Sequence, residues 1–240
     1  MPTKKYWPSG GTTLVPSMTS AAFAFVAEHS RLLDFDLDFS MGLIRELETK
    51  LNRLAQASRD SNASKALLLE LMLTRTVDNF LCFLSELLAL IYRERPEMLR
   101  SSETEKLEFV LQFADMDQLR SAIAEKRVER LSYLGLRELS EYIESQMSFK
   151  LFELAEDLGR AAYIVELRNI CVHARGIVGN TSARRFPQMK TQIGRRIDLS
   201  ADQVTRDRKF LEDCVFDIDL RATSKFTLPA ERVPIPPLDL

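Results

Sequence analysis

The chain has 240 residues, of which 45 % are hydrophobic and 28 % charged, a balance typical of an ordinary globular protein. Its formal net charge of −2 excludes a globally basic surface, so any site for a polyanion such as a nucleic acid must be local. Only 8 Gly and 9 Pro occur, many of them near the ends, and a middle with few chain breakers favours long helices.

The two ends of the chain lack the periodicity of regular structure. Residues 1–20 mix Pro, Gly, Ser and Thr, and residues 223–240 are rich in proline, so both are expected to be irregular tails. The domain is expected to span residues 21–222. At its start, apolar residues recur at helical spacing over 21–31 and 40–57, which predicts two helices.

A long helix is predicted next. Ser64 is expected to cap it, and it would continue to about residue 93, apolar on most faces, as a central element is. Three shorter helices are predicted over 103–115, 116–133 and 136–146.

A further helix is predicted over 149–174, where Gly176 and Gly179 are placed to end it. The Arg- and Gly-rich stretch 180–197 is expected to be a loop. Ser200, with Gln203 three residues later, predicts the start of a last helix. Its apolar face would consist of Val204, Leu211, Val215 and Ile218.

These elements define an all-α fold class, a single-domain helical bundle of six to eight helices with irregular termini. Cys82, Cys171 and Cys214 each lie within an apolar segment, which predicts buried free thiols in a reducing compartment and no zinc site. The apolar run 21–27 is too short to span a membrane and lies too late for a signal peptide. We expect a cytoplasmic protein without membrane association, metal or other cofactor.

The helix predicted over 149–174 carries four strongly polar residues near its end, Glu166, Arg168, Asn169 and His173, among apolar neighbours. Buried polar groups are costly unless they pair or face a cleft. At 100° per residue, Glu166 and Asn169 share the stripe of His173, whereas Arg168 lies about 140° away from it. Only a second helix, or a second copy of the chain, would bring Arg168 and His173 together.

Histidine serves as a general acid or base near neutral pH, and arginine stabilises a phosphoryl group that gains negative charge. This pair suffices for metal-free cleavage of RNA, in which the 2′-hydroxyl attacks the adjacent phosphate. The structural alternative is a buried ion pair of Arg168 or Arg160 with Glu156 or Glu166, beside a hydrogen-bonded core histidine. The spacing alone leaves both readings open.

The segment 168–173, Arg-Asn-Ile-Cys-Val-His, resembles the R-x4–6-H signature of HEPN domains, in which a polar residue often follows the arginine. Its setting is similar too: the motif ends a late apolar helix, and a long apolar helix carrying Asp78 and Asn79 precedes it. The resemblance covers about residues 25–222.

The resemblance implies an all-α bundle that dimerises with its two motif helices facing each other across a composite cleft. It implies a metal-independent endoribonuclease that acts as a toxin, in phage defence or in RNA processing. His173 would be the acid or base, Arg168 would stabilise the phosphate, and Asn169 would position groups by hydrogen bonding. The implied partners are RNA, a second copy, and an antitoxin or defence-system protein. The alternative is a non-catalytic HEPN-like scaffold that binds RNA or protein.

Asp78, Asn79 and Glu166 are expected to line the substrate side of the cleft. Arg175 stands where the branch of the family controlled by a nucleotidyltransferase antitoxin has tyrosine, so tyrosine modification of that type is not expected, and Arg175 would instead add a phosphate contact. Further candidates for phosphate contact are Arg184, Arg185, Arg195 and Arg196, although a basic loop is more often merely solvated.

Overall fold

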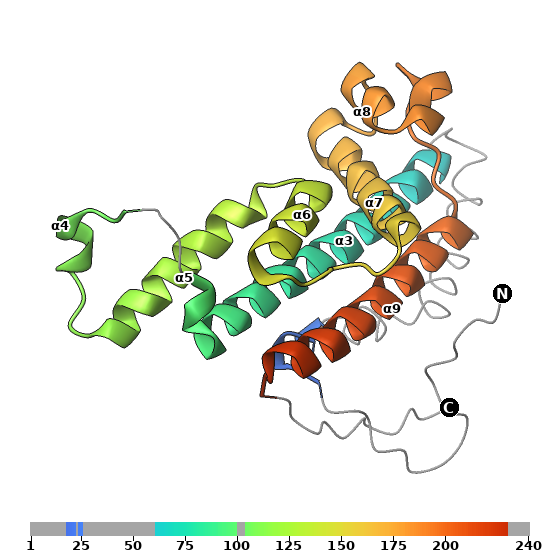
Figure 1. Cartoon of the computed structure of the whole chain (residues 1–240). Coiled ribbons are helices and arrows are strands. Elements are labelled where there is room, and N and C mark those ends of the chain that lie inside the picture. Colours follow the sequence, from blue (N-terminus) through green and yellow to red (C-terminus); the bar gives the residue numbers. More distant parts are fainter. Residues whose placement is uncertain (1–17, 23, 26–60, 100–103, 230–240) are drawn as a thin grey trace, which may run out of the picture.

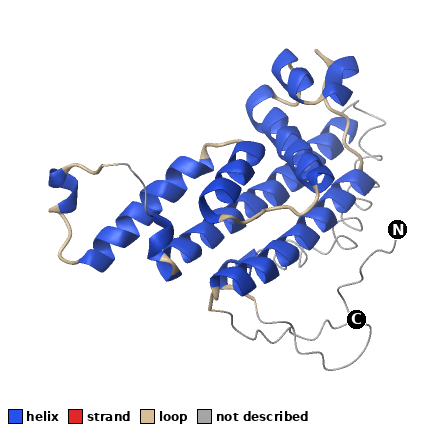
Figure 2. Ribbon diagram, in the orientation of Figure 1, coloured by secondary structure: helices blue, strands red, loops and turns tan. Residues whose placement is uncertain are grey.

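The computed structural model describes residues 18–22, 24–25, 61–99 and 104–229, and only these are discussed below. Within these ranges the ordered elements are helices, and the one β-type pairing is an isolated bridge between Ile177 and Arg196. Figure 2 shows the bundle as helices joined by short loops. The predicted all-α, single-domain bundle is confirmed.

The centre of the bundle is α3, Ser61–Glu94, a helix of 34 residues. It packs against α9 (Ala201–Phe226), α5 (Met116–Ser132) and α7 (Ala155–Ala174), as Figure 1 shows. Contact on several sides explains why its sequence is apolar on most faces. The helix begins three residues before Ser64, so the predicted cap is wrong. The run Ser-Asn-Ala-Ser offers several residues that can start a helix, and periodicity does not choose among them.

One end of the molecule extends away from the bundle as an arm made of α5 and α4, Leu107–Val110 (Figure 1). The short 3₁₀ helix Pro96–Leu99 lies between α3 and this arm. The helix predicted over 103–115 is reduced to the single turn of α4. Leu107 and Leu111 are 70 % and 74 % exposed, so no packed face stabilises a longer helix there.

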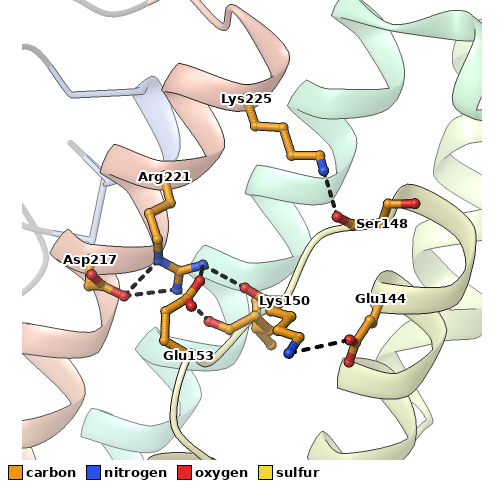
Figure 3. Close-up of polar contacts among 8 residues, drawn as sticks. Glu144, Ser148, Lys150, Glu153, Asp217, Arg221 and Lys225 are labelled. Atoms are coloured by element: carbon orange, nitrogen blue, oxygen red, sulfur yellow. Dashed lines mark hydrogen bonds and ion pairs between the residues drawn. The ribbon is translucent and has the colours of Figure 1, made fainter.

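The helix predicted from residue 149 begins only at Ala155, after α6, Leu136–Met147. Arg221 of α9 explains the difference, because it donates to the carbonyl oxygens of Lys150 at 2.6 Å and Leu151 at 2.9 Å. Lys225 donates to the carbonyl oxygen of Ser148 at 2.5 Å, and Figure 3 shows these contacts with the ion pairs around them. Side chains of α9 thus satisfy the backbone of this connection, which therefore needs no helix.

The stretch 180–197 is not the plain loop that was predicted. It contains α8, Asn180–Arg185, and a 3₁₀ helix, Pro187–Gln192. Its ends are joined by hydrogen bonds from the N–H of Val178 to the carbonyl of Arg195 (3.0 Å) and from the N–H of Ile197 to the carbonyl of Gly176 (2.8 Å). We call residues 175–196 the basic cap.

The last helix, α9, begins as predicted: Ser200 accepts a hydrogen bond from the N–H of Gln203 at 3.1 Å. It runs to Phe226, four residues past the expected domain end at 222. The predicted apolar face is confirmed by the buried side chains Val204, Leu211, Val215 and Ile218.

The N-terminal segment that the structure describes is held against α3 and α9. The hydroxyl and the N–H of Thr19 both donate to the Asp219 carboxylate, and Phe25 is buried. The predicted helix over 40–57 and most of that over 21–31 lie outside the described residues. Along the described part of the chain, no helix is both long enough and apolar enough to span a membrane.

The three cysteines are free thiols, as predicted, but their burial differs. Cys214 is buried and Cys171 is half-buried, whereas Cys82 is exposed, so the expectation of three buried thiols is wrong.

Candidate functional site

The motif helix α7 ends in a tight left-handed turn immediately after the motif. Arg175 has φ of 53° and Gly176 has φ of 77°, and the N–H of Gly176 donates to the carbonyl of Ile170 at 2.9 Å. The N–H of Arg175 turns back to the same carbonyl, so two consecutive left-handed residues close the helix. His173 therefore stands in the last turn of α7, with the basic cap starting two residues later. The prediction that Gly179 helps to end α7 is wrong, because Gly179 is the N-cap of α8.

A cleft of about 840 Å³ lies between α3, the α5–α6 connection, α7 and the end of α8. Its lining includes all four polar motif residues: Glu166, Arg168, Asn169 and His173. The cleft is wide enough to reach two faces of α7, so Arg168 and His173 both border it although they lie on different stripes of the helix. The sequence analysis expected either a second helix or a second copy of the chain to bring the two residues to one cleft. Other helices of the same chain do so.

Arg168 is held in place by acceptors on two elements. Its Nη2 atom lies 2.7 Å from Oδ1 of Asp78 on α3, and its Nη1 atom donates to Oδ1 of Asn169 at 3.1 Å. The side chain of Arg168 is 22 % exposed and that of Asp78 is 34 % exposed. A guanidinium has five N–H donors, so Arg168 keeps further donors at Nη1 and Nη2 for a ligand.

The ion pairs of the structural alternative do not form around Arg168. Its partner is Asp78, whereas Arg160 pairs with Asp207 at 3.3 Å. Glu166 is buried at the floor of the cleft, and its nearest cation is Arg185, at 3.7 Å.

His173 is an exposed side chain, not a core histidine. Among the residues that the structure describes, no hydrogen bond or ion pair engages either ring nitrogen. Both nitrogens are thus open to a ligand in the cleft.

Cys171, the cysteine inside the motif, is a poor candidate for the chemistry. Burial raises its pKa to about 11, and the nearby Glu70 carboxylate acts in the same direction. A thiol with this pKa stays protonated near neutral pH, and the protonated thiol is not a nucleophile. Cys171 is therefore not a candidate nucleophile.

Three predicted site residues do not line the cleft, and the first of them, Asp78, contacts it only through its ion pair with Arg168. Asn79 is buried, and its amide donates to the carbonyl of Phe25 at 3.2 Å, so the prediction that it lines the cleft is wrong. Successive residues of a helix point about 100° apart, which directs Asp78 towards α7 and Asn79 into the core. Arg175 is exposed at the helix cap and does not border the cleft.

Sequence reasoning missed the wall formed by the α5–α6 connection. Arg137 and Glu138 line the cleft there, and the neighbouring Tyr133 is 82 % exposed. These residues show no spacing that links them to the motif, and only the packing of α6 on α7 brings them to it.

Comparison of the chain with protein-family models, with curated proteins and with solved structures finds no match. The resemblance to HEPN domains therefore rests on the motif and its setting. Within the described residues, no three His, Cys, Asp or Glu side chains are grouped so that they could hold a metal ion.

Proposed function

We propose that the protein is a metal-independent endoribonuclease of the HEPN type that cleaves RNA by attack of the 2′-hydroxyl on the adjacent phosphate. The observation that carries this proposal is the shared cleft: an exposed, unpartnered His173 borders the same space as an Arg168 fixed by Asp78 and Asn169. Phosphate transesterification requires a group that transfers protons and a fixed cation in the same site.

In the proposed reaction, the bond between the 2′-oxygen and phosphorus forms while the bond to the 5′-oxygen breaks. A base takes the proton of the 2′-hydroxyl, and an acid gives a proton to the departing 5′-oxygen. Arg168 stabilises the negative charge that gathers on the phosphoryl oxygens between these steps. The products are a 2′,3′-cyclic phosphate and a 5′-hydroxyl.

Two proton transfers favour a site built from two chains. His173 is the one histidine in the described part of the chain, whereas the reaction calls for a base and an acid. A second copy that presents its own motif helix would supply the other imidazole. The surface beside His173 suits such a contact, because Val172 is 46 % exposed and Ile177 is 41 % exposed.

The proposed biological role is that of a toxin or phage-defence effector acting on cytoplasmic RNA, controlled by an antitoxin or defence-system protein. One observation favours the alternative, a scaffold that binds RNA or protein without cleavage: the carboxylate of Asp78 already neutralises Arg168. The two proposed functions differ in whether His173 takes part in cleavage of the bound RNA.

The test is to incubate the purified protein with RNA in EDTA. We expect cleavage that leaves 2′,3′-cyclic phosphate ends, with His173→Ala and Arg168→Ala each lowering the rate by about 10²–10⁴-fold. The matched controls are His29→Ala, which removes the other histidine of the chain, and Arg120→Ala, which removes an exposed arginine of the arm. Both controls should cleave as the unmodified protein does.

Full activity of His173→Ala would contradict the assignment of that residue. An unmodified protein that binds RNA but never cleaves it would instead establish the scaffold. In cells, toxicity on expression that Arg168→Ala relieves would support the role as an effector.

A further inference from the structure

The basic cap has an unusual charge composition for a chain with a net charge of −2. Between Arg175 and Arg196 the sequence contains five arginines, one lysine and no Asp or Glu. A segment whose charged residues are all positive attracts polyanions only if two conditions hold. Neighbouring carboxylates must not neutralise the charges, and the backbone must hold the charged side chains close together. The contacts of each cation therefore decide what this segment does.

Two of the six cations fasten the cap to the bundle. Arg196 donates from Nε and Nη2 to the two carboxylate oxygens of Glu70 on α3, at 2.9 Å and 3.0 Å. Arg185 lies 3.7 Å from the carboxylate of Glu166 on α7. Both arginines are paired: Arg196 fixes the cap against α3 through two hydrogen bonds, whereas the longer, more exposed Arg185–Glu166 pair adds a weaker contact with α7.

The other four cations, Arg175, Arg184, Lys190 and Arg195, are exposed. None of the four side chains forms an ion pair or hydrogen bond with any residue that the structure describes. Arg184 and Lys190 border the same shallow hollow, together with Asn180. Within the described ranges, no carboxylate pairs with these positive charges.

The frame that carries the four cations is well anchored. Phe186 and Met189 are buried beneath the cap, and the ring of Phe186 packs edge-on against Tyr163 of α7, with centroids 5.6 Å apart. The cap also continues into the cleft, because Arg185 and Phe186 line it together with His173. Cations on such a frame lose little backbone freedom when they bind.

From these observations we propose that the basic cap is a docking surface for the phosphate backbone of single-stranded RNA and leads the strand into the cleft. The inference deepens the proposed function, since it names what guides RNA to His173, but binding can be measured without cleavage. Its phosphate contacts are sequence-independent, so the cap supplies affinity and register rather than base specificity.

The test uses the full-length protein with His173→Ala, so that bound RNA stays intact. Fluorescence anisotropy measures the binding of a fluorescein-labelled single-stranded RNA of about 20 nucleotides. In this background we compare the triple variant Arg184→Ala/Lys190→Ala/Arg195→Ala with a control that removes three cations from the arm. The control triple variant is Lys106→Ala/Arg120→Ala/Lys126→Ala.

Each phosphate contact with a single strand contributes about 0.7 to the slope of log K against log salt concentration. Losing three contacts should lower the slope by about 2 and weaken binding roughly 100-fold at about 0.1 M salt. The control should keep its affinity within about threefold, because it changes net charge equally but removes no docking group. Arg184→Lys/Arg195→Lys, which keeps both charges, should also bind within about threefold.

Three results would overturn the proposal: unchanged affinity of the cap variant, equal loss in both triple variants, or no RNA binding by the parent protein. Circular dichroism at equal concentration checks that each variant is folded, and the lysine variant separates lost charge from lost structure. Absence of cleavage by the unmodified protein would refute the proposed function and leave this binding result standing.

Discussion

Gly176 is the position at which we expect a single methyl group to disturb the link between the motif helix and the basic cap. Its φ of 77° lies in the left-handed region, and a Cβ there would meet Arg196 Cγ and Glu70 Oε1, both at 3.2 Å. Gly176→Ala should therefore lower stability in two ways. It imposes a left-handed conformation on alanine, and it pushes apart the two side chains that hold the cap to α3.

The magnitude follows from these two parts. The left-handed backbone costs about 1 kcal/mol for a residue with a Cβ. Weakening the pair between Glu70 and Arg196 adds about 1 kcal/mol or less, because the Arg196 side chain is 53 % exposed and water screens the interaction. The sum is about 2 kcal/mol, or a fall in Tm of roughly 4–8 °C for a domain of this size.

Two other glycines of the cap provide the controls. Gly194 has φ of 75° but no atom within 4 Å of an added Cβ, so Gly194→Ala should show only the backbone cost of about 1 kcal/mol. Gly179 has φ of −96° and open space around it, so Gly179→Ala should change stability by about 0.5 kcal/mol or less.

Thermal and urea unfolding followed by circular dichroism would rank the three variants. The expected order of destabilisation is Gly176→Ala, then Gly194→Ala, then Gly179→Ala. Equal losses at Gly176 and Gly194 would refute the reasoning, because crowding against Glu70 and Arg196 would then contribute nothing.

Two more measurements test other parts of the molecule. Sedimentation of the unmodified protein at micromolar concentration should show a dimer that Val172→Lys converts to monomer; a monomeric unmodified protein would contradict the two-chain site. Burial raises the pKa of Asp219 above its ordinary 3.8, although bonds from Thr19 oppose the rise. The folded protein thus binds the proton more tightly, so Asp219 contributes stability below pH 3.8 that is lost as pH rises through its folded pKa. The unfolding free energy of the unmodified protein, relative to Asp219→Asn, should increase on acidification; no change would contradict this.

Helical periodicity predicted most of the helices in the described chain because those helices bury a continuous apolar stripe. The bounds expected for α5, 116–133, differ by one residue from those found, since Asp115 accepts hydrogen bonds from the N–H groups of Asp117 and Gln118 and fixes the start. Ser200 starts α9 in the same way. Where a stripe and a local cap agree, the sequence determines the element.

Prediction failed where remote side chains decide the backbone. Nothing near residue 149 in the sequence prevents a helix. Arg221 and Lys225, which belong to α9, donate hydrogen bonds to backbone carbonyls of this segment (Figure 3). The prediction of a helix over 103–115 was wrong for the opposite reason, because its apolar residues Leu107 and Leu111 do not pack against another element. Local pattern does not report either kind of long-range contact.

The candidate site shows the same division between local and remote information. The sequence identified Arg168, Asn169 and His173 from their polarity on an apolar helix, and all three border the cleft. It did not predict that Asp78 would pair with Arg168, because these two residues lie 90 positions apart in the sequence. The pairing limits the proposed chemistry: Asp78 orients the guanidinium but also offsets its charge. In the proposed reaction, the net positive charge for phosphate must then come from outside the motif. Among the described residues, Arg137 in the wall of the cleft and the exposed cations of the basic cap are sources of that charge.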